Sequence, residues 1–185
     1  YKRQVSDLKA KADGTTVAWV QAYIVAGIKS STDMSISSEN DVVFGTQPTG
    51  VKATAFLIAD DRGESDYKNC SAVNLSGKTA GCSEVKAALN LVDNATTPLP
   101  RLVTLKGTLV KNTWGLPGLK EVTTAILEDG TIIGEGGDEP TPPVGGVTFF
   151  EESFASDKGT FTIEDKTRPT KVSEIWKWES YTPET

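Results

Sequence analysis

Histidine is missing from the sequence, and its 185 residues include only two cysteines and one methionine. Without an imidazole the chain cannot carry a Ser-His-Asp or Cys-His catalytic arrangement, a histidine-ligated zinc ion or a histidine pH switch. Cys70 and Cys82 are too few for a zinc site, and their spacing is not that of a CxxC redox motif. They either form a disulfide in an exported protein or remain free thiols, and the sequence leaves both alternatives open. We expect no catalytic residues, no metal and no cofactor.

Long apolar runs and an excess of positive charge are also absent. No run reaches the roughly 18 apolar residues that a membrane-spanning helix needs, so we expect no transmembrane segment. Residues 1–127 hold 14 Lys and Arg against 12 Asp and Glu, whereas residues 128–185 hold 5 against 13. The first part lacks the basic excess of a dedicated nucleic-acid binder, and the second would repel phosphate. The charge distribution therefore disfavours nucleic acid as the partner.

The distribution of apolar residues, glycine and proline divides the chain at the same place. Hydrophobic residues make up 37% of the chain, which is low for one compact domain of this length, and their alternation is concentrated before residue 128. The stretch GEGGDEPTPPVGG then has five glycines and three prolines, a composition typical of an extended linker. We predict a domain over 1–127, an acidic Gly- and Pro-rich linker over 128–146, and a β-rich segment over 147–185 that is too short for a core of its own.

Apolar patterns predict five strands and two helices within the first part. The strands are 15–27, 53–59, 71–75, 102–110 and 116–127, and the helices are 2–12 and 82–91. Gly107 interrupts the fourth strand, and a glycine at such a point typically marks a bulge or bend through which a sheet curls. With one helix between the third and fourth strands, the order β-β-β-α-β-β is that of an OB-fold. We therefore predict a mainly β protein, a five-stranded OB-like barrel with a β-rich C-terminal extension.

Aromatic side chains are the candidate ligand-binding residues. Trp19 and Tyr23 share the outward face of the first strand, where OB-folds commonly receive ligands, and Trp114 lies in the turn between the last two strands. Such rings stack on sugars or nucleobases. The alternative is that Trp19 and Tyr23 pack under the N-terminal helix or the C-terminal tail as core residues. Lys29 and Lys111 are candidates to line the same groove, although lysines on strands also protect sheet edges.

A long polar stretch, residues 28–52, occupies the position of the first inter-strand loop. It is rich in serine and contains one apolar island, Val42–Phe44. Loops of this length in compact domains are usually functional or mobile. We therefore include the loop in the candidate binding surface.

Four carboxylates, Asp60, Asp61, Glu64 and Asp66, follow the second strand within seven residues. Clustered oxygens suit hard cations, and a pair of carboxylates could act as the acid and base of a glycosidase. The spacing does not match a calcium-binding loop, however, and Arg62 lies within the stretch. The sequence favours a solvated turn without a metal.

Four segments resemble a known family: AWVQAYIVAG at 18–27, FLIADD at 56–61, EVKAALNLVDN at 84–94 and LVTLKGTLVKNTWGLPGLKEV at 102–122. Together they resemble an OB-fold-like domain of unknown function found in exported and surface lipoproteins of gut-type anaerobic bacteria. The tail, FFEESFASDKGTFTIEDK with IWKWESY, resembles the first strands of a jelly-roll module of the choice-of-anchor type. The resemblance implies an exported, non-catalytic protein at the outer cell surface, with a lipid anchor upstream of this chain as one means of attachment. It carries over no catalytic residues, and Cys82 departs from the family pattern.

Three functions remain open on the sequence. The leading hypothesis is an exported binding module that engages a polysaccharide or a protein through loop 28–52 and Trp114. The second is single-stranded nucleic-acid binding on the outer face of the barrel, and the third is a spacer that presents the C-terminal segment. A steep loss of oligonucleotide binding with salt would support the second. Binding to glycan and protein arrays that is unchanged by Trp114→Ala and by deletion of residues 30–50 would support the third.

Overall fold

The computed structural model describes residues 2–135, so most of the predicted linker and the whole predicted segment 147–185 lie outside the described residues. Two α-helices, two short 3-10 helices and eight strands make up the described part. In chain order they are β1 (Lys2–Arg3), α1 (Val5–Lys11), β2 (Val17–Lys29), η1 (Glu39–Asp41), β3 (Val42–Phe44), β4 (Val51–Ala59), η2 (Tyr67–Asn69), β5 (Ser71–Asn74), α2 (Cys82–Leu89), β6 (Arg101–Thr113), β7 (Leu116–Leu127) and β8 (Ile132–Gly134).

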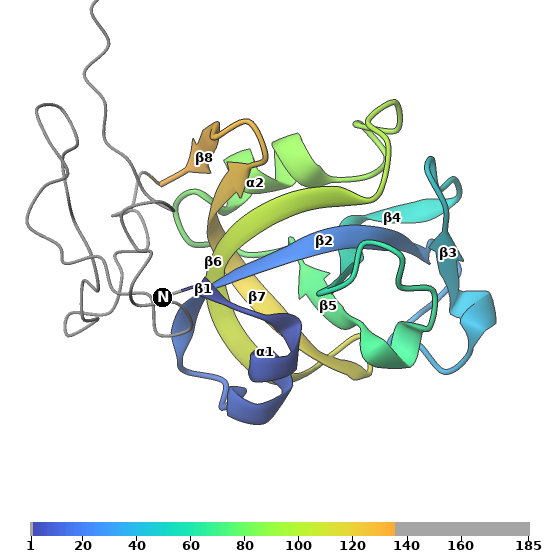
Figure 1. Cartoon of the computed structure of the whole chain (residues 1–185), viewed down its shortest axis with the longest axis horizontal. Helices are drawn as coiled ribbons and strands as arrows, with labels where there is room; N and C mark the ends of the chain where they lie inside the picture. The colour runs from blue at the N-terminus through green and yellow to red at the C-terminus, as the bar shows by residue number, and fades with distance from the viewer. Residues whose placement is uncertain (1, 136–185) are drawn as a thin grey trace, which may run out of the picture. The chain divides into compact units, whose positions relative to one another are not determined.

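Five of the strands close into a barrel (Figure 1). β2 pairs antiparallel with β4 on one edge and with β6 on the other. β4 continues antiparallel to β5, β6 pairs antiparallel with β7, and a short parallel pairing of β5 with β7 completes the ring. Because α2 lies between β5 and β6, the order of the barrel elements is the predicted β-β-β-α-β-β. The mainly β fold and the OB-like barrel are confirmed.

The helix between the third and fourth barrel strands ends slightly earlier than expected. The sequence predicts it over 82–91, whereas α2 ends at Leu89. The side-chain amide of Asn90 donates to the carbonyl oxygens of Lys86 and Ala87, at 3.0 and 3.4 Å. The carbonyl oxygen of Lys86 also accepts the backbone N–H of Asn90 at 3.0 Å, whereas that of Ala87 lies beyond the last helical N–H, so the Asn90 side chain caps the end of the helix.

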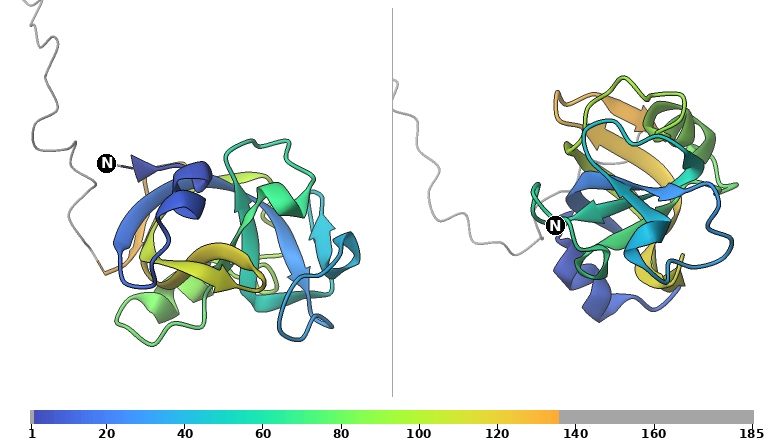
Figure 2. Two further views of the ribbon diagram at one scale, coloured as in Figure 1. Left: turned by 90° about the horizontal axis from the view of Figure 1, so that it is seen from below. Right: turned by 90° about the vertical axis from the view of Figure 1, so that its right-hand side faces the viewer.

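One face of each barrel strand fills the interior. On β2 this face carries Val20, Ala22 and Ile24, each at most 2% exposed, as the alternation in the sequence predicts. α1 adds Val5 and Leu8 to the same core, and α2 packs from the opposite side of the barrel (Figure 2). Full burial of one such valine, leucine or isoleucine side chain contributes about 1.5–3 kcal/mol, so this interior is the main source of stability.

Gly107 is the point at which the β6–β7 ladder bends. The pairing register shifts between Lys106 and Thr108. A Cβ atom on Gly107 would lie 3.1 Å from the carbonyl oxygen of Lys120 and 3.2 Å from a methyl carbon of Val122. The bend predicted at this glycine is confirmed, and the close approach of β7 explains the absence of a side chain.

Three short strands, β1, β3 and β8, are missing from the sequence prediction. β3 pairs with β2, and β8 returns along the end of β7 through a turn in which the N–H of Gly130 donates to the carbonyl oxygen of Leu127 at 3.0 Å. Strands of two or three residues are too short to show an alternation. The sheet therefore continues to Gly134, within the stretch from residue 128 that the sequence analysis assigns to the linker.

Candidate functional site

Loop 28–52 folds back over the outer side of the barrel. Beneath it, outward side chains of β4 and β5 form a second apolar cluster, separate from the barrel interior. Leu57 and Ala72 are 0% exposed in this cluster although they point away from the interior. From the loop, Ile36 and Val42 belong to the same cluster. The protein's own loop therefore fills the face on which OB-folds commonly receive ligands.

Three hydrogen bonds tie the loop to neighbouring connections, and one of them runs from the N–H of Leu99, before β6, to the carbonyl oxygen of Thr46 at 2.9 Å. The N–H of Ile36 donates to the carbonyl oxygen of Trp114 at 2.9 Å, which joins the loop to the β6–β7 hairpin. The hydroxyl of Tyr67, in the β4–β5 connection, donates to the carbonyl oxygen of Ser37 at 3.4 Å. Three connections of the barrel thus meet at one place, and the loop is held at its middle as well as at its ends.

The Asp41 carboxylate organises the serine-rich turn before β3. Its Oδ2 accepts the backbone N–H groups of Ser37 and Ser38, both at 2.9 Å, and their hydroxyls at 3.0 and 3.3 Å. These hydrogen bonds, of which the backbone N–H of Ser37 has the largest effect, lower the pKa of Asp41 to about 2. The carboxylate is therefore charged at neutral pH and holds both serines in place.

Trp114 occupies the tip of the β6–β7 hairpin in a left-handed backbone conformation, with φ 56°. Gly115 follows with φ 83°, and Thr113 pairs with Leu116, so Trp114 and Gly115 form a two-residue hairpin turn. The N–H of Gly115 donates to the side-chain oxygen of Asn112 at 3.0 Å. Such turns favour Asn followed by Gly, because asparagine tolerates a positive φ better than a bulky residue does. A tryptophan at this position is strained.

The indole ring of Trp114 is half-buried against the second cluster. The Nζ atom of Lys52 lies 5.1 Å from the ring centroid, a cation–π distance, and donates to the carbonyl oxygen of Ser30 at 3.0 Å. The indole N–H is buried and finds no acceptor among the described residues. The hairpin tip thus combines a strained backbone with an unsatisfied donor, and both features are more frequent at functional positions than elsewhere.

Three more aromatic side chains border the same cluster: Tyr23, Phe44 and Tyr67. Each of them, like Trp114, is neither fully buried nor fully exposed. The fold therefore brings together Tyr23 and Trp114, two of the residues that the sequence singles out. Phe44 and Tyr67 also border this cluster, although the sequence analysis does not name them as candidate site residues. The apolar island in loop 28–52 is a signal for Phe44, whereas no pattern in the sequence points to Tyr67.

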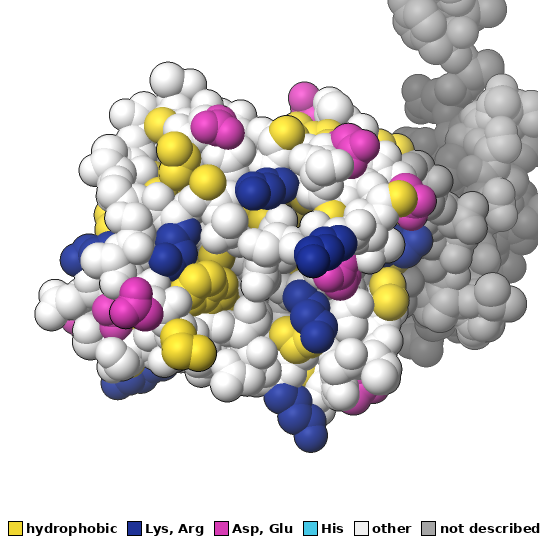
Figure 3. All heavy atoms as spheres, turned by 180° about the vertical axis from the view of Figure 1, so that it is seen from behind, with side chains coloured by type: hydrophobic (Ala, Val, Ile, Leu, Met, Phe, Trp, Pro, Cys, Tyr) yellow, Lys and Arg dark blue, Asp and Glu magenta, His cyan; other side chains and the backbone are white. Residues whose placement is uncertain are grey.

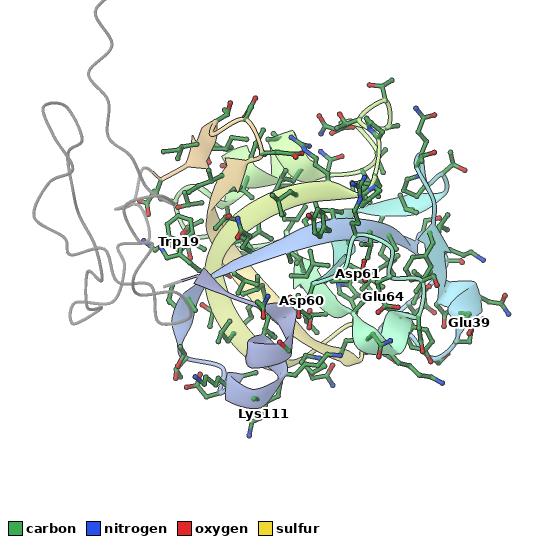
Figure 4. All side chains as sticks on the ribbon, viewed as in Figure 1. Trp19, Glu39, Asp60, Asp61, Glu64 and Lys111 are labelled. Carbon is green, nitrogen blue, oxygen red and sulfur yellow. The ribbon has the colours of Figure 1, made fainter. Side chains whose placement is uncertain are left out.

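The remaining candidate residues are Trp19, Lys29 and Lys111, of which Figure 4 labels Trp19 and Lys111. Trp19 is half-buried on β2, with the Nζ atom of Lys106 5.8 Å from its ring centroid. Lys111 is exposed near the tip of β6, and Lys29 is half-buried where β2 ends. Figure 4 shows Trp19 and Lys111 well apart from each other and from Glu39 of η1. Trp19 therefore lies apart from the hairpin tip, whereas Lys29 belongs to loop 28–52 and pairs with Val51, and Lys111 precedes Trp114 by three residues.

The carboxylates after β4 have structural partners. Asp60 accepts the N–H groups of Val5 and Ser6, at 2.6 and 3.1 Å, and so caps the start of α1. Asp61 and Glu64 accept backbone N–H groups of their own turn. Within residues 2–135, no group of three or more His, Cys, Asp or Glu side chains is arranged to hold a metal ion. The solvated-turn interpretation fits these contacts.

Both cysteines are free thiols. Cys70 is 0% exposed in the second cluster, and desolvation raises its pKa to about 12. Cys82 begins α2 and is 2% exposed, and its pKa is raised by burial and then by the Glu121 carboxylate. Of the two alternatives that the sequence leaves open, the structure has the free thiols.

The closed ring β2-β4-β5-β7-β6, with one helix before β6 and a long loop after β2, defines an OB-like domain. Within this class, the chain belongs to the family DUF6359, a domain of unknown function, whose model matches residues 4–128. This match bears out the resemblance of the barrel to an OB-like domain of unknown function, whereas the resemblance of the tail concerns residues outside the described part. Comparison with curated proteins and with solved structures gave no match. Neither α-helix in residues 2–135 has the length and apolar character needed to cross a bilayer.

Proposed function

We propose that this domain is a non-catalytic binding module, exported to the cell surface, that contacts a polysaccharide or a protein through loop 28–52 and the hairpin tip at Trp114. The observation that carries the proposal is the backbone of Trp114. A left-handed conformation costs a residue with a Cβ atom about 1–2 kcal/mol, and asparagine would avoid most of this cost. A large aromatic ring kept at such a position is well suited to contact a ligand.

The fixed geometry of the loop supports the same proposal. Asp41 holds the serine-rich turn, and hydrogen bonds from Ile36 and Tyr67 attach the loop to its neighbours. A surface that is ordered before binding avoids an entropy loss of about 0.5–1.5 kcal/mol for each side chain that would otherwise be immobilised. Met34 stands at the loop tip with 87% of its side chain exposed and offers an apolar contact on this frame.

The covered outer face favours this function over nucleic-acid binding. Base stacking on an OB-fold uses aromatic rings that stand on open strands. Here loop 28–52 covers the outward side chains of β4 and β5, so a ligand meets the loop and not the sheet. On the side opposite to that of Figure 1, basic and acidic side chains are interspersed (Figure 3). Such a mixture attracts a polyanion only weakly.

The test is binding of the full 185-residue chain to glycan and protein arrays, before and after substitution of the hairpin tip. Trp114→Asn removes the ring while suiting the positive φ, so the turn itself is not strained further. We expect Trp114→Asn to reduce the array signal strongly and Met34→Glu to weaken it. Val17→Thr, at a position of β2 that is 57% exposed, is the matched control and keeps the signal.

Circular dichroism and thermal unfolding of each variant show whether a lost signal reflects lost contacts or a lost fold. Native binding by both Trp114→Asn and Met34→Glu would contradict the proposal and favour the spacer function. An unmodified chain that binds no glycan and no protein on either array would contradict it as well.

A further inference from the structure

A depression of about 300 Å³ opens where β6 begins and β7 ends. The segment before β6 forms one wall, and the turn after β7 forms the other. The residues that matter for its chemistry are Pro98, Pro100, Arg101, Leu127, Glu128 and Asp129. This depression lies at the opposite end of the β6–β7 hairpin from Trp114, because Arg101 begins the 13-residue strand β6 and Trp114 follows its end. It therefore lies away from Trp114, although Leu99, between the two wall prolines, donates its N–H to the carbonyl oxygen of Thr46 in loop 28–52.

Arg101 supplies hydrogen-bond donors to the depression. Its guanidinium is half-buried, and desolvation lowers its pKa while the nearby Asp129 carboxylate opposes this shift. The guanidinium presents five N–H groups in a rigid fork. A partly desolvated donor is stabilised by each acceptor that a ligand brings to it. Arg101 is thus ready to receive oxygen atoms of a ligand.

The carboxylates of Glu128 and Asp129 determine which kind of oxygen-bearing ligand fits the depression. Asp129 accepts the N–H of Thr131 at 2.9 Å, which lowers its pKa and keeps it charged at neutral pH. With Glu128, the depression holds two acidic side chains against one basic side chain, and this balance opposes a carboxylate or phosphate ligand. A neutral polyol escapes that repulsion, because each hydroxyl can accept from Arg101 and donate to Glu128 or Asp129.

Apart from Thr97, the remaining wall is apolar. Pro98, Pro100 and Leu127 present rings and methyl groups, against which the C–H face of a pyranose can pack and leave water. The volume is at the lower end of the range of about 300–1,000 Å³ that is common for ligand pockets, which suits one or two sugar units rather than a long chain. We propose that this depression is a second binding site, and that it takes a neutral sugar unit of a polysaccharide. The inference rests on the proposed function only in choosing polysaccharide over protein as the ligand.

The test is a titration of the full ¹⁵N-labelled chain with neutral hexaoses of glucose, xylose and mannose, and with an acidic oligogalacturonide, followed by two-dimensional NMR. The side-chain Nε–H of Arg101 and the amides of 127–129 report on the depression. The amides of 34–38 and the indole N–H of Trp114 report on the loop surface. We expect one neutral hexaose to shift the first set of signals.

Two substitutions separate the sites. Arg101→Lys keeps the charge but loses the planar fork, and we expect it to weaken binding at the depression by about tenfold or more. Trp114→Asn is the matched control and leaves this affinity unchanged. Because a substitution on β6 can disturb the barrel, Glu128→Gln on the exposed turn is a second variant for which we also expect weaker binding.

Shifts confined to 34–38 and Trp114 would overturn the second site and leave the proposed function standing. Shifts at the depression with the oligogalacturonide alone would overturn the assignment of a neutral sugar. Native affinity in folded Arg101→Lys and Glu128→Gln would overturn the roles of both side chains, and the absence of shifts with all four sugars would overturn the site itself.

Discussion

The carboxylate of Glu121 accepts both the backbone N–H and the hydroxyl of Thr79, at 3.1 and 2.7 Å, although the two residues are 42 positions apart. The N–H of Lys78 donates to the same oxygen at 3.0 Å. Glu121 has a left-handed backbone conformation on β7, with φ 48°. Gly77 leaves room for the carboxylate, because a Cβ atom there would lie 3.0 Å from its Oε2. This contact fixes the β5–α2 connection to β7 and thereby positions α2.

We expect Glu121→Ala to lower the free energy of unfolding by about 0.5–1.5 kcal/mol, since it removes an acceptor shared by Lys78 and Thr79, whose exposed donors can then bond water. Glu121→Gln keeps a neutral acceptor and should lose less. Urea unfolding followed by circular dichroism measures the free energy of unfolding of both variants. Lys120→Ala, at the exposed neighbouring position, is the control and should change stability by no more than about 0.5 kcal/mol. A Glu121→Ala protein as stable as its parent would show that the contact does not stabilise the fold.

Acid should loosen loop 28–52. The pKa of Asp41 is about 2 in the folded protein, against 3.8 for the unperturbed side chain. A carboxylate whose pKa is lower in the folded state contributes stability that is complete above the unfolded value and is lost as the pH falls through the folded value. The N–H groups of Ser37 and Ser38 should therefore exchange faster with solvent as the pH falls from about 4 to about 2, after correction for intrinsic exchange rates.

Asp41→Asn is the control for this pH dependence. The amide keeps one acceptor oxygen but does not titrate, so the exchange of these two N–H groups should be faster at neutral pH and should respond less to acid. Asp13, Glu121 and Asp129 also have lowered pKa values, so global stability should still fall with acid in the variant. The same acid response of Ser37 and Ser38 in both proteins would exclude Asp41 as its cause.

The barrel could be predicted from the sequence because its strands carry strong local signals. The alternation through Val20, Ala22 and Ile24 marks an inward face, and Gly107 marks the bend of β6. Five such strands with a helix before the fourth leave few ways to bury their apolar faces, and the OB order is one of them. Local pattern and global fold agree here, as expected of a sequence that specifies one structure.

The covering of the outer face could not be predicted, because it depends on contacts between segments far apart in sequence. The pairing register of β2 with β4 shifts between Ile24 and Ala26, so Val25 and Ala26 both join the outer cluster. A continuous apolar stretch does not reveal such a bulge. The hydrogen bond from Ile36 to Trp114 likewise has no sequence signal. The sequence therefore identifies Trp114 and the loop as candidates but not their contact.

Two buried hydroxyls offer a comparison of paired and unpaired polar groups. Ser71 on β5 and Thr124 on β7 are both 0% exposed. The Thr124 hydroxyl donates to the carbonyl oxygen of Glu135 at 2.7 Å, whereas the Ser71 hydroxyl has no partner within residues 2–135. Removing an unpaired buried polar group is neutral or favourable, and removing a paired one leaves its partner unsatisfied.

We therefore expect Ser71→Ala to raise the free energy of unfolding by up to about 1 kcal/mol, and Thr124→Val to lower it by about 1–3 kcal/mol. Chemical denaturation measures both changes, and the slope of the unfolding free energy against denaturant concentration should stay the same in each variant. A loss of stability in Ser71→Ala comparable with that in Thr124→Val would reveal a partner for the serine hydroxyl, such as a buried water molecule, and would contradict the contrast.

Both thiols should resist modification while the fold is intact. Cys70 and Cys82 are at most 2% exposed, and burial raises the pKa of each. Because the thiolate is the reactive form, lack of access and lack of ionisation protect them together. At pH 8 we expect iodoacetamide to leave the mass of the folded protein unchanged over hours, and to add two labels per chain in urea without a reductant.

The Glu121 carboxylate lies 3.8 Å from the Cys82 sulfur, so loosening this contact should expose one thiol before the other. In Glu121→Ala, Cys82 should react in the native state faster than Cys70, which lies in the separate outer cluster. Peptide mapping after brief labelling measures the ratio of label on Cys82 to label on Cys70. Equal rates would mean that both thiols are reached only by global unfolding, and a chain that takes no label in urea until it is reduced would contain a disulfide and contradict the free thiols.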